Sequence, residues 1–354
     1  MTNETQQITP SRQPSHPAQA APVYVVPRRS FGRRFIGGLV VLLLIVSLVL
    51  NGYLGALLAM HLQSPVQKNV LRDGAEGQTI ALCEINGIID GDTAAWFDTF
   101  YRTVADDRNV KAVLIRVESP GGGVTPSDQI AERIRRLREK GKKVVVSMGS
   151  LAASGGYYVS AGADEIFAEE TTLTGSIGVI LQWPVFKGTL DKIGVEMITL
   201  KSAHSREWKD ELSPFRKPEP QEREHLIGLL NEVQNRFEQV VLRGRGSKLK
   251  AHEAPKDEKP DKDRLEYEAF NGKVYMAEKA MKLGLVDTIG YQANALDRAA
   301  GMAALDNPRV VRYSRREGLF EQMMGSRPPA GVSVDVETLD RLQTPRMLLM
   351  WKAE

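Results

Sequence analysis

The chain has 354 residues, of which 42% are hydrophobic and 26% charged, so most of it can fold around an apolar core. The formal net charge is only +3, and no basic stripe is interleaved with aromatic residues, which argues against a nucleic-acid partner. The single cysteine, Cys83, excludes an intrachain disulfide, and the five histidines show no metal-ligand spacing. We therefore expect no metal and no other cofactor.

The N-terminal part of the chain divides into a polar and an apolar segment. Residues 1–34 are polar and rich in proline, which predicts a disordered tail. An almost wholly apolar run follows, and it predicts a transmembrane helix over 35–60. At ~1.5 Å per residue this run spans about 37 Å, more than the ~30 Å core of a bilayer. A cleaved signal peptide has a shorter apolar region, and a buried helix of a soluble domain is rarely so uniformly apolar, so an uncleaved anchor is favoured.

The charges on either side of the apolar run predict its orientation. Four arginines lie between residues 28 and 34, whereas the other side carries only His61, Lys68 and Arg72 nearby. By the positive-inside rule, the tail is cytoplasmic and the chain beyond residue 61 is extracytoplasmic. We predict a single-pass membrane protein in which residues 61–77 form a polar linker.

Strands and helices alternate from Gln78 onward. We predict strands at 79–85, 112–117, 143–148, 165–168, 177–182 and 196–200, and helices at 93–106, 126–140, 154–162, 187–193, 219–243 and 291–303. This alternation predicts an α/β fold with a largely parallel sheet over 78–303. Residues 304–354 are predicted to form a partly disordered C-terminal extension with one short strand at 309–313.

Ser154 stands in the stretch Ala-Ala-Ser-Gly-Gly-Tyr-Tyr, shortly after an apolar run that ends at Met148. The pattern predicts a strand, a sharp turn and a helix that begins at Ser154. At such a place small neighbours let a substrate carbonyl approach, and free backbone N–H groups can stabilise an oxyanion. Taken alone, a serine that caps the helix is the simpler interpretation.

Three other stretches favour a catalytic interpretation. Residues 118–124 place three consecutive glycines between a strand and a helix, so the backbone there can approach a ligand closely. Neither the Walker pattern nor the dinucleotide glycine pattern matches this loop. Residues 172–180 contain Ser176 in Leu-Thr-Gly-Ser-Ile-Gly-Val, and residues 209–215 begin with Lys209 and continue to Ser-Pro-Phe.

The motifs S-P-G-G-G, A-S-G-G-Y-Y, L-T-G-S-I-G-V and K-D-x-x-S-P-F, with a fifth stretch at 271–290, occur in one order over roughly residues 78–300. Together they resemble the bacterial signal peptide peptidases of the SppA type, in their short single-domain form. The resemblance implies a Ser/Lys peptidase domain over 78–303 with a ClpP/crotonase-like spiral of ββα units, in the bacterial plasma (inner) membrane. It also implies that the substrates are cleaved signal peptides and similar hydrophobic peptides. The implied assembly is a homo-oligomeric ring, with eight protomers as the expected number.

The resemblance also assigns roles to residues. It makes Ser154 the nucleophile, Lys209 the general base and Ser176 the hydroxyl that orients the lysine. A free lysine has a pKa of ~10.4, so an apolar pocket must hold the base neutral. The oxyanion donors would be backbone N–H groups at Gly121, Gly122 and Gly155.

Two alternatives for the base remain open. Lys201 lies in a Lys-Ser-Ala stretch that also resembles the family pattern, and residues 205–208 lengthen the segment before Lys209. The register between the two lysines is therefore open. A triad that uses His204 is less favoured, because no matching motif contains a His/Asp pair.

Two other functions compete with the peptidase. A crotonase-like acyl-CoA enzyme would share the fold and the glycine-rich oxyanion loops, but its chemistry needs neither a Ser/Lys pair nor a membrane anchor. A catalytically inactive membrane scaffold would not need Ser154, Ser176 and Lys209. We therefore expect a membrane-anchored serine endopeptidase.

Overall fold

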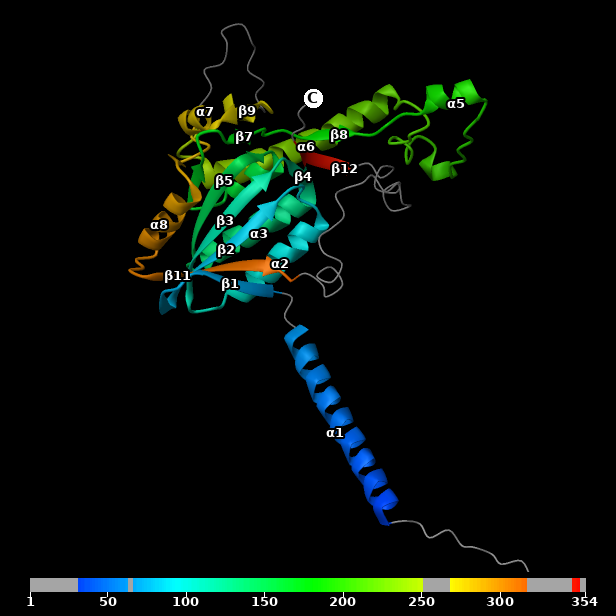
Figure 1. Cartoon of the computed structure of the whole chain (residues 1–354). Coiled ribbons are helices and arrows are strands. Elements are labelled where there is room, and N and C mark those ends of the chain that lie inside the picture. The colour runs from blue at the N-terminus through cyan, green and yellow to red at the C-terminus, as the bar shows by residue number, and fades with distance from the viewer. Residues whose placement is uncertain (1–30, 63–65, 251–267, 317–345, 351–354) are drawn as a thin grey trace, which may run out of the picture. The chain divides into compact units, whose positions relative to one another are not determined.

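The computed structural model describes residues 31–62, 66–250, 268–316 and 346–350. The chain forms two compact units, Met1–Gln63 and Ser64–Glu354. The described part of the first unit is one helix, α1 (Phe31–Leu62), shown in blue in Figure 1. Within the described residues, α1 alone is long and apolar enough to cross a membrane, over Ile36–Gly55 with a mean hydropathy of 2.3. None of that stretch is buried in protein, as expected of a helix that is apolar on all sides.

The second unit is built on a nine-stranded sheet whose main path runs β1-β11-β2-β3-β5-β6-β10 (Figure 1). Neighbouring strands on this path are parallel except for β1 and β11. A short strand, β7, continues the sheet beside the end of β5, and β9 pairs with β7. The bounds are β1 (Val66–Arg72), β2 (Ala75–Asn86), β3 (Val110–Ser119), β5 (Lys143–Ala153), β6 (Glu165–Ala168), β7 (Leu173–Gly175), β9 (Val274–Met276), β10 (Thr288–Ile289) and β11 (Pro308–Arg315).

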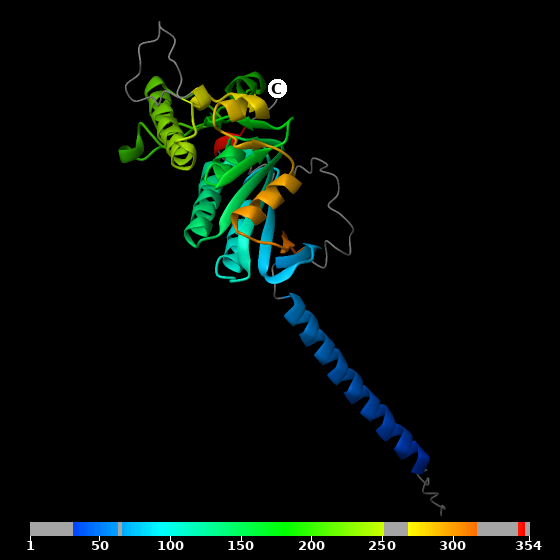
Figure 2. The ribbon, with the colours of Figure 1, turned by 90° about the vertical axis from the view of Figure 1, so that its left-hand side faces the viewer.

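Both faces of this sheet are covered by helices (Figure 2). Ile80 and Leu82 of β2 pack with α8 (Gln292–Met302) on one face. The alternate residues of the same strand, among them Cys83, point to the other face, because successive side chains of a strand point in opposite directions. That face is covered by α2 (Gly91–Val104) and α3 (Val124–Glu139), which contribute apolar side chains to the same core. Two covered faces explain why the central strands are almost continuously apolar.

Helix α4 (Gly155–Ser160) follows β5 directly and packs against the long helix α6 (Pro220–Arg245). The rings of Tyr158 in α4 and Phe237 in α6 have their centroids 4.8 Å apart, and both residues are buried. Aromatic pairs at this separation stabilise packing beyond their buried area. The contact holds the two helices together immediately after the turn at the end of β5.

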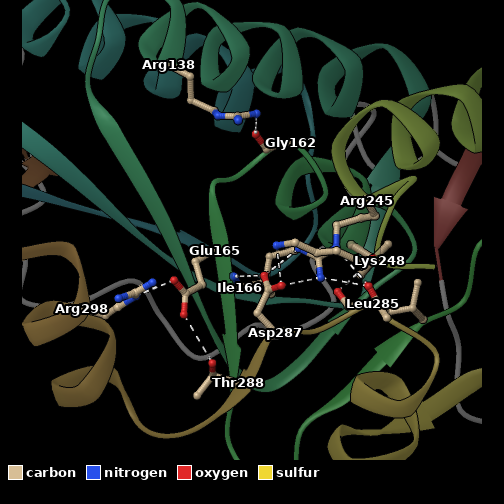
Figure 3. Close-up of polar contacts among 12 residues, drawn as sticks. Arg138, Gly162, Glu165, Ile166, Arg245, Lys248, Leu285, Asp287, Thr288 and Arg298 are labelled. Carbon is tan, nitrogen blue, oxygen red and sulfur yellow. Dashed lines mark hydrogen bonds and ion pairs between the residues drawn. The ribbon is translucent and has the colours of Figure 1, made fainter. Parts of the chain in front are cut away.

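A buried ion pair fixes the C-terminal end of α6 (Figure 3). The Arg245 side chain has no exposed surface, and its guanidinium donates to the Asp287 carboxylate at 2.6 and 2.9 Å. Asp287 also accepts a hydrogen bond of 2.9 Å from the Ile166 N–H of β6. Tyr157 of α4 donates to the Leu285 carbonyl at 3.0 Å, two residues before Asp287. Helices α4 and α6 and strand β6 are therefore tied to one short segment of the chain.

The remaining elements are a small second sheet and several short helices. A second sheet of three antiparallel strands has the order β4-β12-β8. Its bounds are β4 (Gly121–Gly123), β8 (Ile180–Gln182) and β12 (Arg346–Met350). The other helices are α5 (Lys187–Ile193), α7 (Ala277–Lys282) and two short 3-10 helices, η1 (Ala203–Ser205) and η2 (Glu268–Phe270).

The structure corrects the predicted domain boundaries. The linker over 61–77 is wrong, because Val66–Arg72 forms strand β1 and β2 begins at Ala75. β1 is an edge strand with mostly exposed polar residues, so its sequence resembles a linker. The strand predicted at 309–313 is confirmed as β11, which lies inside the sheet between β1 and β2. The globular unit therefore reaches beyond 78–303 at both ends.

Two predicted strands also differ from the structure. The segment 196–200 forms no strand, and all five of its residues are exposed. The strand predicted over 177–182 is confined to Ile180–Gln182. Most of the predicted disordered tail, residues 1–30, and much of the predicted C-terminal extension, residues 317–345, lie outside the described residues.

Candidate active site

Ser154 lies at the turn between β5 and α4 in an unusual backbone conformation. Its φ of 53° and ψ of −113° fall in a region that non-glycine residues rarely adopt. The residue is 1% exposed, and among the described residues its Oγ has no hydrogen-bond partner. A helix-capping serine would accept a hydrogen bond from the first turn, and Ser154 makes no such bond. A strained turn that holds an unpaired hydroxyl is instead typical of a nucleophile.

Ser176 follows strand β7 in the same way that Ser154 follows β5. The two strands are parallel, and their last pair joins Ala153 to Gly175. The Ser154 N–H donates to the Gly175 carbonyl at 2.8 Å, and the Ser176 N–H donates to the Lys273 carbonyl at 2.7 Å. Ser176 is 7% exposed. The structure therefore brings the two predicted serines to the same edge of the sheet.

The glycine loop packs against the start of α4. A Cβ on Gly155 would lie 3.0 Å from the Gly122 nitrogen and 3.1 Å from the Gly121 Cα, so a side chain there would crowd the loop. The first N–H groups of α4 have no acceptor within the helix, which leaves Gly155 suited to an oxyanion. The Gly121 N–H already donates to Ser119 Oγ at 3.1 Å. Of the three predicted donors, Gly122 and Gly155 are therefore the better placed.

The two candidate lysines have different surroundings. Lys201 is half-buried and forms an ion pair with Asp210, which also accepts hydrogen bonds of 2.7 and 3.0 Å from Arg216. Hydrogen bonds from Arg216, and then from Lys201, lower the pKa of Asp210 to about 2. Arg216 is bound in turn by Glu222 at the start of α6. Lys201 thus serves as the ammonium partner of a carboxylate, whereas a general base must be a neutral amine.

Lys209 has no such partner. It is exposed, and it forms no hydrogen bond or ion pair with any described residue. Its φ is 84°, so Ser154, Ser176 and Lys209 are three of the four non-glycine residues with positive φ in the described part of the chain. Lys209 belongs to the segment between β8 and α6, from which α5 projects away from the main sheet (Figure 1). Within one chain, therefore, the structure joins Ser176 but not Lys209 to the turn of Ser154.

Similar proteins identify the family. Residues 136–306 match peptidase family S49. A relative from Enterococcus faecium that bears the name signal peptide peptidase SppA is 32% identical over 289 residues, which cover 78% of this chain and 79% of that protein. The chain belongs to peptidase family S49. Protease 4 of Haemophilus influenzae is 35% identical over 230 residues, and this match covers 62% of this chain but only 34% of that protein.

Family membership confirms the SppA-type resemblance and the α/β, ClpP/crotonase-like fold, and it makes the chain a serine-type peptidase. A protease from Synechocystis is 34% identical over 231 residues, and this match covers 65% of this chain and 76% of that protein. Among solved structures, the 1510-N membrane-bound stomatin-specific protease covers 70% of this chain and 96% of its own at 16% identity, with a TM-score of 0.37. That likeness is too distant to carry an argument about the site.

Sequence analysis of this S49 peptidase missed several side chains that support the turn. Tyr158 donates to Asp128 of α3 at 2.6 Å, and Arg236 of α6 donates to the same carboxylate at 2.9 Å. Ser127 donates to the Gly123 carbonyl at 2.8 Å, next to the place where Gly155 packs. Ser127 and Asp128 stand four and five residues after Gly123 in the sequence. The role of Asp128 could not be recognised from the sequence, because its partners Tyr158 and Arg236 lie far away along the chain, whereas Ser127 bonds Gly123 only four residues before it.

Strand β12 lies across the glycine loop of the S49 peptidase. It pairs antiparallel with β4 through Leu348 and Gly123, and with β8 through Leu348 and Ile180. β4 contains two of the predicted oxyanion glycines, and β8 follows shortly after Ser176. The two edges can therefore accept an extended chain between them, and in this structure a segment of the protein itself occupies that place.

Proposed function

We propose that this S49 peptidase is a membrane-anchored endopeptidase that degrades cleaved signal peptides and similar hydrophobic peptides with a Ser154–Lys209 dyad. The observation that carries the proposal is the buried Ser154 Oγ, which has no partner among the described residues although the strained turn fixes its position. A buried hydroxyl without a hydrogen bond costs about 1–3 kcal/mol, so such a group is explained best by a partner that arrives with assembly or substrate.

In this proposal the neutral amine of Lys209 takes the proton of Ser154 Oγ while Oγ attacks the scissile carbonyl. The N–H groups of Gly122 and Gly155 stabilise the resulting oxyanion. The lysine then gives its proton to the leaving amine, and water hydrolyses the acyl-enzyme by the same path in reverse. Ser176 orients the lysine amine through its hydroxyl, which can both donate and accept a hydrogen bond.

The lysine is proposed to come from a neighbouring subunit of a homo-oligomeric ring, with eight subunits as the expected number. The support is that Lys209 is exposed and makes no bond to Ser154 within one chain. Its segment also exposes a run of large apolar side chains, which is typical of a subunit contact. These are Val185, Phe186, Ile193, Val195, Met197, Ile198, Leu200, Trp208 and Phe215.

The anchor is proposed to be α1, in the bacterial plasma (inner) membrane. Its apolar stretch Ile36–Gly55 is long enough to span, and the arginines on its N-terminal side support a cytoplasmic N-terminus. The catalytic unit is then extracytoplasmic. Hydrophobic peptides released by other proteases stay in or near the bilayer, so an anchored enzyme would meet them there.

A fluorophosphonate probe tests the nucleophile on the full chain in detergent. The wild type should be labelled and Ser154→Ala should not. Ser160→Ala is the matched control, because Ser160 is a buried serine of the same helix whose Oγ bonds the Gly156 carbonyl at 2.7 Å. Equal labelling of wild type and Ser154→Ala would overturn the assignment, as expected of an acyl-CoA enzyme or an inactive scaffold.

The substrate class needs a separate assay. Detergent-solubilised enzyme should cleave a synthetic signal-peptide remnant faster than a polar peptide of equal length. If the probe labels Ser154 but the polar peptide is the better substrate, the dyad stands and the signal-peptide role does not.

A further inference from the structure

A pocket lies at the opposite end of the parallel sheet from Ser154. Its volume is about 510 Å³, and it is lined where β3 and β5 begin and where α3 and α8 end. Pockets of ~300–1,000 Å³ are the usual size for small-molecule ligands. The lining residues are Arg108, Val110, Lys111, Lys140, Gly141, Lys142, Lys143, Met302, Ala303 and Ala304.

The lining of this pocket is strongly cationic. It contains five basic residues and no acidic residue. Lys140 is neutralised from outside the pocket by Asp106, whose carboxylate lies 2.6 Å from its Nζ. Among the described residues, Arg108, Lys111 and Lys143 have no ion-pair partner. The pocket therefore keeps most of its positive charge.

Lys142 is the part of the pocket that is built into the fold. The residue is 9% exposed, and its Nζ donates to the carbonyls of Asp107 and Val110 at 2.6 and 2.7 Å. Carbonyls fix the position of an ammonium but do not neutralise its charge. Burial lowers the pKa of Lys142, Asp107 raises it in part, and the charge of Lys111 lowers it again. A buried cation among other cations is costly unless an anion is close.

The nearby helix ends account for only some of the basic residues in the lining of the pocket. The negative ends of α3 and α8 lie at the pocket and favour nearby cations, which accounts for Lys140 at the C-cap of α3. Lys111 and Lys143 instead belong to the strands β3 and β5, so the helix ends do not account for these two cations in the lining. We propose that this pocket binds a phosphate-bearing anion, because phosphate offers several charged oxygens to the lysine and arginine donors of the lining.

The ligand can come from two sources with this shared chemistry, a free organic or inorganic phosphate or the headgroup of an anionic phospholipid. Isothermal titration calorimetry on the full chain in a neutral detergent separates them. The probes are inorganic phosphate, glycerol phosphate and dihexanoyl phosphatidylglycerol, with dihexanoyl phosphatidylcholine as the zwitterionic control.

The pocket variant combines Lys111→Glu with Lys143→Glu, since both residues are exposed and their replacement leaves the core intact. The matched control combines Arg223→Glu with Lys250→Glu, two exposed residues that do not line the pocket. We expect about tenfold weaker binding in the pocket variant and unchanged binding in the control. Lys143→Gln is a milder second variant, with an expected loss of about threefold, for the case that charge reversal prevents folding.

Each outcome decides the proposal. Loss of phosphate and glycerol phosphate binding in the pocket variant alone supports a free phosphate ligand. The same loss seen only with phosphatidylglycerol supports a lipid headgroup. The proposal is wrong if no probe binds the wild type, or if wild type and folded pocket variants bind every probe equally.

Discussion

Ser154 and Ser176 both have a positive φ, 53° and 51°, and both stand at the ends of two paired strands. In each case the serine follows the last paired residue of its strand, Ala153 in β5 and Gly175 in β7. The two hydroxyl-bearing residues are therefore held in register by the pairing of β5 and β7, to which Thr174 adds a side-chain hydrogen bond of 2.7 Å to the Ala152 carbonyl.

The two candidate bases should separate on mutation. Lys209→Ala should lower kcat/KM by about 10³-fold or more, because the nucleophile loses its base. Lys201→Ala should impair the enzyme less, because it removes an ion pair with Asp210 that shapes the segment. The measurement is kcat/KM on a fluorogenic peptide for both variants at one pH.

The pH profile provides an independent check of the base. A lysine acts only after its proton has left, so kcat/KM should rise between about pH 6 and pH 9. A flat profile over that range would count against a lysine base. If Lys201→Ala abolishes activity and Lys209→Ala does not, the motif register across 205–208 is wrong and Lys201 is the base.

A shared site predicts complementation between inactive chains. Ser154→Ala and Lys209→Ala protein should regain activity when they are mixed under conditions of subunit exchange. Some contacts then join an intact serine to an intact lysine from two different chains. Fluorescence energy transfer between labelled chains monitors the exchange. A mixture that exchanges and stays inactive would place both residues of the dyad in one chain.

The buried ion pair predicts a loss of stability in acid. Burial alone would raise the pKa of Asp287, but Arg245 and then Lys248 outweigh it, so the pKa lies below its usual value. A lowered folded-state pKa stabilises the protein above the unfolded value of ~3.9, and this contribution is lost as pH falls through the folded-state pKa. The free energy of unfolding should therefore drop below about pH 4 in the wild type, and Asp287→Asn should flatten this part of the curve.

At neutral pH Asp287→Asn should cost about 3–5 kcal/mol, because it leaves Arg245 charged and buried. Asp297→Asn is the control, since the Asp297 side chain is 72% exposed and its distance to Arg72 is 3.9 Å. Its effect should stay below about 1 kcal/mol. Denaturant titration of both variants at several pH values gives the comparison, and equal losses would contradict a special role for the ion pair.

Removal of β12 should raise peptidase activity. A chain that ends at residue 345 lacks the strand between β4 and β8, so a peptide substrate no longer has to displace it. We expect a lower KM with kcat little changed. Leu348→Pro in the full chain should act in the same direction, because proline cannot donate to the strand pairing. An unchanged KM in both proteins would show that substrate does not use these edges.

Much of the fold could be predicted from local pattern. The apolar runs around Leu114 and Val145 indicated central strands, and the structure places both in the middle of the sheet. The order of β1 and β11 could not be predicted, because an antiparallel edge pairing between the two ends of a domain depends on contacts far apart in sequence. The three-residue strands β4 and β7 were missed for a related reason, since each is defined by its partner.

In the candidate site, too, the features set by neighbouring residues could be predicted, and those set by distant residues could not. The turn at Ser154 could be predicted because the small residues and glycines around it are contiguous. The carboxylate of Asp128, which joins Tyr158 to Arg236, gave no such signal. The surroundings of Lys209 also remain unpredictable from the sequence of one chain, because the residues proposed to face it belong to another subunit.

The positive φ angles at Ser154, Ser176 and Lys209 lower the folding stability, yet these residues carry the side chains proposed for catalysis. Glycine adopts such angles without steric cost, so a redesign guided by folding energy alone would favour glycine at all three positions, with about 1 kcal/mol of strain relieved at each. The thermostable protein obtained in this way would have lost every side chain of the proposed dyad and its support.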